Sequence, residues 1–313
     1  METETDSTFG EENSTSGSLT NSITNYQNKH GRTYHALDSG IYPFPNDIQE
    51  RDRLDMVHAV FNRALEGHLH RAPIDDNPPN VLDIGTGTGI WAIEFADSHG
   101  GSRVRGIDLS PIQPTYGPRN LEFLVDNVEK TWSDSIKYDF IHSRCMAGAI
   151  EDWQRLVNQA FDNLREGGWV EFQELVGCAY SKDSENPQPN HAMFELMESL
   201  SKAGEINHRT MDPGPSFTDW AGTSGFINIE EYRTKLPFGI RPDKPDCEDI
   251  GSLLAASFYY GVDGLTAVPL IDTLEWPAEK VCALNDRVRR ACNSPDTRLQ
   301  IELELIVVFA QKP

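Results

Sequence analysis

An apolar run that ends in three glycines at alternate positions constrains this chain more than any other feature. Residues 81–89 read Val-Leu-Asp-Ile-Gly-Thr-Gly-Thr-Gly, and a helical pattern follows from Ile90. This order is typical of a strand, a tight glycine loop and a helix, where an α/β protein binds a nucleotide-like ligand. Glycine is favoured because a side chain would hold the ligand away from the backbone N–H groups, and because such turns use positive φ. The segment therefore predicts a ligand-binding α/β domain.

The loop residues also narrow the choice of ligand. A dinucleotide-binding loop, Gly-x-Gly-x-x-Gly or Ala, would place its third small residue at position 90, where this chain has Ile90. A phosphate-binding loop needs a lysine beside its last glycine, and here Ile90 and Trp91 follow. Asp83, inside the strand, would repel phosphates but could pair with a cation. These residues favour a ligand that carries an ammonium or sulfonium group, and so favour S-adenosylmethionine.

Two later strands each end in an acid. The first reaches Asp108 about 20 residues after the glycine loop, where a carboxylate can accept hydrogen bonds from both ribose hydroxyls. The second ends in Asp126, and this acid or the backbone of Asn127 and Val128 is placed for the adenine amino group. Leu109 and Val128 would flank the ring. An acid after a strand is also a common turn former, but two of them downstream of one glycine loop favour an adenosyl pocket.

Several stretches of the chain resemble the LaeA-like or UMTA-type methyltransferases of filamentous fungi, within the class I S-adenosylmethionine-dependent fold. The order and spacing of these stretches match too, and the likeness covers roughly residues 30–313. DLSPIQP and the segment His142-Ser143-Arg144 are more specific to this family than the glycine loop is. The matching stretches are LDIGTGTGIWAIEFAD (82–97), GIDLSPIQP (106–114), Asp126 with Trp132, YDFIHSRCMAGAIEDW (138–153) and LREGGWVEFQE (164–174).

The resemblance implies an α/β fold, a class I methyltransferase Rossmann-like sheet of seven strands with the last one antiparallel, and helical N-terminal and lid additions. The cofactor would lie across the C-terminal ends of the first strands. Together with the loop and the two acids, this implies a cofactor site made of Asp83, Gly85, Thr86, Gly87, Gly89, Asp108, Leu109, Asp126, Asn127, Val128, Ser143 and Arg144.

The implied activity is S-adenosylmethionine-dependent methyl transfer to a small molecule, in fungal secondary metabolism. One alternative is a LaeA-like regulator that binds the cofactor and acts through protein partners, with little or no turnover of small molecules. Another is a nicotinamide-dependent oxidoreductase, which the missing third glycine of the loop disfavours.

Methyl transfer from a sulfonium is an in-line displacement, so the protein must align the acceptor with the methyl group and exclude water. No covalent nucleophile is needed, and a base is required only when the pKa of the acceptor lies above the ambient pH. His142 and Glu174, both near expected strand ends, are the candidates for that base. Each could instead be a hydrogen-bonded structural residue.

Composition bears on the classes of partner. With 27 basic and 49 acidic residues the net charge is −22, which disfavours nucleic acid and anionic membranes. The five cysteines are scattered, without Cys-x-x-Cys or a histidine at metal-ligand spacing, so we expect a reducing compartment and no metal site. The N-terminus does not read as a signal peptide, and no window approaches the ~20 apolar residues of a membrane helix. We therefore expect a cytoplasmic protein, with the nucleus as the alternative location.

The pattern along the chain predicts its organisation. Residues 1–28 are polar and acidic and predict a disordered tail, before a single methyltransferase domain over 29–313. An apolar stripe predicts a helix over 46–69, packed ahead of the sheet. The stretch from about 235 to 290 is too long for a hairpin and predicts a helical lid over the acceptor site. Side chains before the first long helix suggest a gate over the cofactor: Tyr26, Tyr34, His35 and Tyr42.

Overall fold

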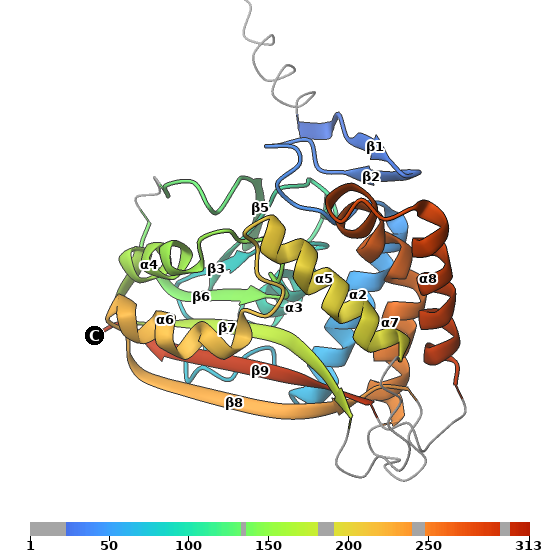
Figure 1. The fold of residues 1–313 in the computed structure, drawn as a ribbon. Coiled ribbons are helices and arrows are strands. Elements are labelled where there is room, and N and C mark those ends of the chain that lie inside the picture. Colours follow the sequence, from blue (N-terminus) through green and yellow to red (C-terminus); the bar gives the residue numbers. More distant parts are fainter. Residues whose placement is uncertain (1–22, 133–135, 181–190, 240–247, 295–300) are drawn as a thin grey trace, which may run out of the picture.

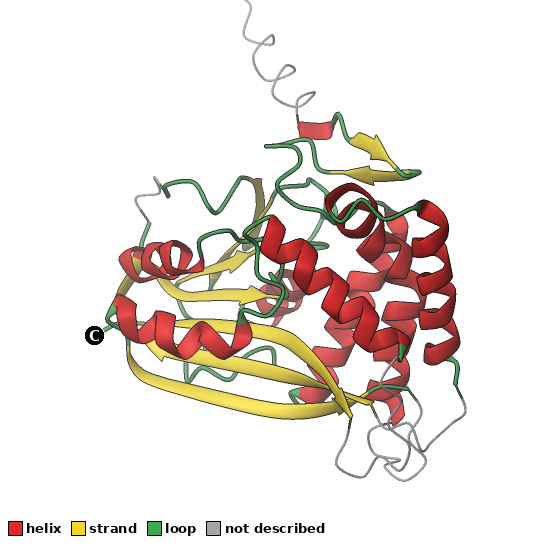
Figure 2. Cartoon of the chain, in the orientation of Figure 1, coloured by secondary structure: helices red, strands yellow, loops and turns green. Residues whose placement is uncertain are grey.

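The computed structural model describes residues 23–132, 136–180, 191–239, 248–294 and 301–313. At its centre is a seven-stranded sheet in the order β5-β4-β3-β6-β7-β9-β8 (Figures 1 and 2). β9 is antiparallel to both of its neighbours, β7 and β8, and the other adjacent strands are parallel. The predicted fold, in which only the last strand is reversed, is confirmed.

The strands follow apolar runs of the sequence. β7 begins directly after a helix that ends at Asn163, and its first residue, Leu164, pairs with Tyr138 of β6. At its other end β7 continues to Tyr180, because β9 pairs with it between Trp169 and Tyr180. The strands are β3 (Asn80–Ile84), β4 (Arg103–Asp108), β5 (Leu121–Val125), β6 (Tyr138–Arg144), β7 (Leu164–Tyr180), β8 (Ile227–Pro237) and β9 (Ile301–Gln311).

Helices cover both faces of the sheet. α4 and α6 lie on one face, whereas α3 and a group of four longer helices, α2, α5, α7 and α8, lie on the other and beyond the end of the sheet (Figure 1). The helices are α2 (Ile48–Ala64), α3 (Ile90–Ser98), α4 (Trp153–Asn163), α5 (Ala192–Ile206), α6 (Phe217–Ser224), α7 (Glu248–Thr266) and α8 (Ala278–Cys292), with the short turns η1 (Gly214–Ser216) and η3 (Ala267–Thr273).

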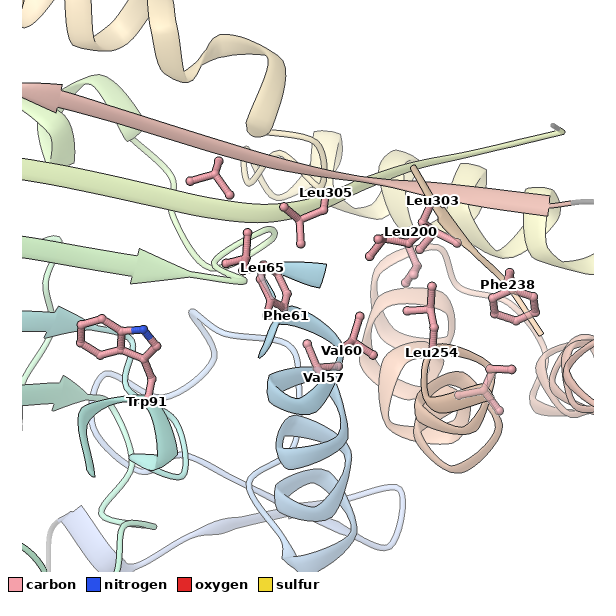
Figure 3. Packing of buried hydrophobic residues seen from close by; sticks show 14 of the residues in the cluster. Val57, Val60, Phe61, Leu65, Trp91, Leu200, Phe238, Leu254, Leu303 and Leu305 are labelled. Atoms are coloured by element: carbon pink, nitrogen blue, oxygen red, sulfur yellow. The ribbon is translucent and has the colours of Figure 1, made fainter. Parts of the chain in front are cut away.

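Two hydrophobic cores follow from the alternation of side chains along each strand. Leu82 and Ile84 of β3 pack with α4 and α6, whereas Val81, whose side chain is on the other face of the strand, packs with the opposite core. Figure 3 shows part of that second core, where Val57 and Phe61 of α2 lie between α3 and α7. α2 therefore joins the sheet domain to the helical group and fixes their relative position.

The predicted N-terminal helix is confirmed as α2, although it is shorter than 46–69. Asp47 caps it, because its carboxylate accepts a hydrogen bond from the backbone N–H of Glu50. The helix ends at Ala64 because Glu66 and Gly67 take positive φ angles of 58° and 83°, which a right-handed helix cannot include.

The region predicted as a lid forms α7, η3 and α8, which pack against α2 and α5. Pro269 lacks the N–H that a regular helix needs, and Leu274 N donates to the Pro269 carbonyl in a wider turn at η3. The stretch Asp249–Thr273 is long and apolar enough to cross a membrane by length and composition, which corrects the expectation that no such window exists. Within this stretch, 61% of the apolar window is buried inside the molecule, as in a helix that packs in a protein core.

A small hairpin precedes α2 and corrects the predicted boundary of the tail. β1 (Gln27–Lys29) pairs with β2 (Arg32–Tyr34), so residues 27 and 28 belong to ordered structure, while residues 1–22 of the predicted tail lie outside the described residues. His30 at the turn lies 2.8 Å from Asp272 of η3, and Arg32 pairs with Asp47. The hairpin is thus attached to the helical group on both sides, at the top of the view in Figure 1.

Candidate functional site

A cavity of about 1060 Å³ opens at the C-terminal ends of β3, β4 and β6. The glycine loop after β3 and the segment of residues 35–46, called the strap below, both line it. Parallel sheets place their ligand sites at this edge, where the order of the strands reverses. Of the predicted cofactor residues, the cavity wall includes Gly85, Thr86, Gly87, Asp108, Leu109, Asp126, Asn127, Val128 and Arg144.

The glycine loop has the positive φ angles that the sequence predicted, and protein side chains approach it closely. Gly85, Gly87 and Gly89 have positive φ angles of 66°, 57° and 82°. A Cβ on Gly85 would lie 2.1 Å from Met146 Sδ, and one on Gly89 would lie 2.5 Å from the ring of Phe123. Gly89 begins α3 and lies outside the cavity wall, so its role is to let the helix start against Phe123.

Asp108 at the end of β4 organises the loop from the other side. Its carboxylate accepts a hydrogen bond from Gly87 N at 2.9 Å and another from Ser110 N at 3.0 Å. Burial raises the pKa of Asp108 to about 6, against the lowering effect of these two bonds. A further hydrogen-bond donor, such as a ribose hydroxyl, would favour the charged form of this acid.

Asp126 and its neighbours form the wall after β5. The Asp126 carboxylate accepts the N–H of Asn127 at 2.7 Å, and Asn127 Nδ2 donates to Asp38 of the strap at 2.9 Å. Val128 and Leu109 line the same cavity, as expected for residues that flank a ring.

Asp83 lies behind the cavity wall. One of its oxygens accepts a hydrogen bond from Thr86 Oγ1 at 2.6 Å and the other from His142 Nδ1 at 2.8 Å. The His142 ring stacks on Trp91, with 3.8 Å between the ring centroids. Burial lowers the pKa of His142, against the raising effect of Asp83. Asp83 and His142 therefore support the glycine loop from inside the sheet.

This placement corrects the prediction of His142 as a base. The residue is fully buried and is absent from the cavity wall, so a bound acceptor would not meet its ring. Ser143, predicted for the cofactor site, is also buried in β6 and lies outside the wall. Both are held within the sheet, where β6 is flanked by β3 and β7.

Glu174, the other candidate base, holds the loop after β6. Its Oε2 accepts the N–H groups of Met146 at 2.9 Å and Ala147 at 3.1 Å, and burial raises its pKa to about 8. Glu174 is absent from the cavity wall, whereas Met146 lies on it. The structure thus gives Glu174 the role of positioning the wall rather than of meeting the acceptor.

Arg144 does reach the wall, next to α2. Its Nη2 donates to His58 Nδ1 at 2.8 Å, and its guanidinium lies 5.0 Å from the centre of the Phe61 ring. Burial lowers the pKa of Arg144, and burial together with the Arg144 charge lowers the pKa of His58 to about 4. His58 is therefore neutral at pH 7.

Sequence reasoning missed the bonds that fasten the strap and the loop. Asn46 Nδ2 donates to Ser110 Oγ at 3.1 Å, after β4. Asp38 pairs with Lys130 at 2.5 Å, after β5. Gln113, in the DLSPIQP stretch, donates to the Gly87 carbonyl at 2.7 Å and so holds the glycine loop. The strap is therefore fixed to the loops that carry both acids.

The suggested gate is present in part. His35 and Tyr42 lie on the cavity wall, together with Ile41 and Phe44 of the same strap. Tyr34 is buried in the hairpin, and Tyr26 lines a separate surface hollow beside Arg51. Two of the four side chains named from the sequence thus face the cofactor cavity.

Known proteins agree with this geometry. A family model described as a methyltransferase domain matches residues 56–231. The chain belongs to this methyltransferase family. It is 46% identical over 297 residues to the methyltransferase pytC of Aspergillus terreus, which covers 95% of this chain and 91% of pytC. It is 34% identical over 259 residues to the secondary metabolism regulator LAE1 of Cochliobolus heterostrophus, covering 81% of this chain and 84% of LAE1. Among solved structures, the YcgJ protein of Bacillus subtilis has a TM-score of 0.49 at 16% identity, over 82% of this chain and 98% of that one.

The LaeA-like resemblance is thus confirmed, and the cofactor of this methyltransferase is S-adenosylmethionine. The residues present fit that cofactor: Gly85 and Gly87 line the cavity without side chains, and the Asp108 carboxylate at the same wall accepts the Gly87 N–H. When bound, the cofactor supplies an activated methyl group. Within the part of the chain that the structure describes, no group of three His, Cys, Asp or Glu side chains is placed to hold a metal ion.

Proposed function

We propose that this methyltransferase acts on a small molecule of fungal secondary metabolism. The observation that carries the proposal is the strap, whose residues line the cofactor cavity and which is bonded at Asp38 and Asn46 to the loops after β5 and β4. An acceptor that enters beneath such a strap must be small. The name of LAE1, a secondary metabolism regulator, supports the metabolic setting.

The residues of the chain would act by alignment and by exclusion of water. The glycine loop and Asp108 hold the adenosyl end, and the wall of Ile41, Tyr42 and Phe44 keeps the reacting end apolar. Alignment alone can contribute about 7–11 kcal/mol to a displacement of this kind. The strand-end loops are rigid enough for this purpose because buried carboxylates, among them Glu174, fix their backbones.

The test is transfer of label. The purified protein is incubated with methyl-labelled S-adenosylmethionine and fungal metabolite extracts, including one from Aspergillus terreus, and the products are separated by mass spectrometry. We expect one or a few small molecules to gain a methyl group in a protein-dependent manner. Binding of the cofactor with no labelled small molecule in any extract would contradict the proposal.

A second candidate is a cofactor-binding regulator that acts through protein partners. The 34% identity to LAE1 favours it, since that relative is named as a regulator. In this case the label would appear in protein bands, or nowhere, while the cofactor still binds.

We infer a cytoplasmic location for the enzyme, with the nucleus as the alternative for a regulator, and a fluorescent fusion in a filamentous fungus distinguishes the two.

A further inference from the structure

His35 lies on the wall of the cofactor cavity with both ring nitrogens unused. The residue is only 2% exposed, and neither Nδ1 nor Nε2 has a hydrogen-bond partner among the described residues. Other buried side chains in the described ranges also have unpartnered atoms, but none of those residues lines this cavity. Buried polar groups are normally paired, so an unpaired imidazole at a ligand cavity indicates a partner supplied by the ligand.

The backbone around His35 is held firmly. Tyr34, directly before it, pairs with Gln27 in the hairpin, and Asn46 N donates to the Thr33 carbonyl at 2.8 Å. Asp38, three residues later, is tied to Asn127 at 2.9 Å. The unpaired ring therefore belongs to a fixed part of the strap.

The charges around His35 keep it neutral. Burial lowers its pKa, and the charges of Lys29 and Arg209 act in the same direction. Asp38 acts in the opposite direction, through its charge and through its nearby backbone, which makes no hydrogen bond of normal geometry with the ring. The charge of Arg209 is itself balanced by ion pairs with Glu129 at 2.9 Å and with Glu151 at 3.5 Å. A neutral imidazole can accept a proton, which an imidazolium cannot.

A side cavity of about 810 Å³ adjoins this part of the strap. Ile41 lines both cavities, and Gly148 of the side cavity is next to Ala149 of the main one. Its wall combines apolar side chains, among them Leu200, Ala203, Met211 and Val268, with the polar Asn207 and Thr273, and Arg209 is the charged residue of the described lining. Because Arg209 is already paired, this cavity suits an uncharged apolar body.

We propose that His35 binds the hydroxyl of an uncharged, largely apolar methyl acceptor and takes its proton, while the body of the acceptor occupies the side cavity. The proposal rests on the small-molecule function given above. The acceptor oxygen forms a C–O bond with the methyl carbon as the S–C bond breaks, and the electron pair of that bond remains on sulfur. The hydroxyl proton passes to a ring nitrogen of His35, so the positive charge of the sulfonium ends as an imidazolium.

The first test needs no knowledge of the natural acceptor. Protein with ¹⁵N-labelled histidine is saturated with S-adenosylhomocysteine and titrated with 2-naphthol, an uncharged aromatic alcohol. We expect the ring-nitrogen signals of His35 to shift, and Val268→Phe, which fills the side cavity, to abolish the shift. The charged 2-naphthoate should bind at least about tenfold more weakly, because Arg209, the cation of the side cavity's described lining, is already paired. Saturating 2-naphthol that leaves the His35 signals unchanged would overturn the proposal.

The second test measures label transfer from methyl-labelled cofactor into a fungal extract between pH 5 and 8. His35→Ala and His35→Gln should each lower the rate about 100-fold at pH 7, as expected for loss of a general base. The wild-type rate should fall as the pH drops below the ordinary pKa range of a histidine side chain, because a protonated His35 cannot take a proton from the acceptor. The variants should lack that fall. Exposed His68 provides the matched control, and His68→Ala should behave as wild type.

The outcomes separate this proposal from the proposed function. Unchanged rates and pH profile in His35→Ala would exclude the base while leaving small-molecule methyl transfer intact. If the wild type labels nothing although S-adenosylhomocysteine binds, the proposed function fails, and the naphthol titration still decides whether His35 meets a hydroxyl ligand. Circular dichroism and thermal unfolding of His35→Ala should show the wild-type fold, which excludes a general loss of folding.

Discussion

The carboxylate of Asp108 accepts a hydrogen bond from the backbone N–H of Gly87 at 2.9 Å. This bond joins the end of β4 to the glycine loop after β3, so the two motifs that indicated a nucleotide-like ligand form one unit. Gln113 closes the same unit from the other side by donating to the Gly87 carbonyl at 2.7 Å. The loop conformation thus depends on residues more than twenty positions away in sequence.

Asp108→Ala should weaken binding of S-adenosylhomocysteine by more than about tenfold, because a charged hydrogen-bond acceptor at the cavity wall is lost. Isothermal titration calorimetry measures the change. Asp126→Ala is the comparison, since the Asp126 carboxylate bonds only to the next residue's N–H among the described contacts, and its loss should be smaller. A larger effect at Asp126 than at Asp108 would reverse our assignment of the two acids.

Gly85→Ala should destabilise the protein by about 1–3 kcal/mol, because alanine is strained at a φ of 66° and its Cβ would displace Met146. Chemical denaturation followed by fluorescence gives the free energy of unfolding. Gly100→Ala is the matched control, because its Cβ would meet no atom within 4 Å, and should change stability by less than about 0.5 kcal/mol. Equal stability of the two variants would show that the loop tolerates a side chain.

The strands before the glycine loop and the two acids, and the position of the cofactor loop, could be predicted because they depend on local patterns, whereas the reversed last strand came from the family resemblance. The apolar runs before Gly85 and Asp108 are strands whatever the rest of the chain does, and parallel strands must place their C-terminal ends at one edge. This shared edge explains why nine predicted cofactor residues line one cavity although they come from four separate segments.

The two candidate bases could not be placed from sequence, because the pattern does not say which helix covers a given strand face. His142 has the same phase as Phe140 in β6, and that face is closed by Trp91 of α3. Glu174 was expected near the end of its strand, but β7 continues to Tyr180 and Glu174 is buried. In both cases tertiary packing decided between a structural and a chemical role.

The position of the strap could not be predicted from the sequence, for a different reason. Its position depends on pairs such as Asn46 with Ser110 and Asp38 with Asn127, which are 64 and 89 residues apart. No periodic pattern marks such contacts, and only the aromatic and histidine residues before α2 hinted at a covering segment. His35 was one of those residues, but only the positions of its neighbours in the structure show that its ring nitrogens are unpaired.

Asp38→Ala should release S-adenosylhomocysteine about 2- to 5-fold faster, as expected for the loss of a partly exposed ion pair worth at most about 1 kcal/mol. The cause is the lost bond from the strap to Lys130 and Asn127. Surface plasmon resonance gives the dissociation rate, and added salt should bring the wild type closer to the variant. Asp75→Ala, which removes a distant exposed acid 3.8 Å from Arg165, should leave the rate unchanged. Identical rates for all three proteins would mean that the strap does not limit release.

Glu174→Gln should make the stability of the protein less dependent on pH. The pKa of Glu174 is about 8 in the folded protein and near 4.5 when the chain is unfolded, so the folded state holds the proton more tightly. Its stabilising effect is therefore full below pH 4.5 and is lost as the pH rises through 8. Between these limits one such group gives a slope of at most about 1.4 kcal/mol per pH unit.

Urea unfolding at half-unit steps from pH 5 to 8.5 measures that slope. Glutamine keeps an oxygen that can accept the N–H groups of Met146 and Ala147, but it cannot ionise, so the variant should lose less stability than the wild type as the pH rises. Glu166→Gln, at an exposed position, serves as the control and should retain the wild-type slope. An unchanged slope in Glu174→Gln would mean that Glu174 is already ionised in the folded protein, and that the loop after β6 is held by a charged rather than a protonated carboxyl group.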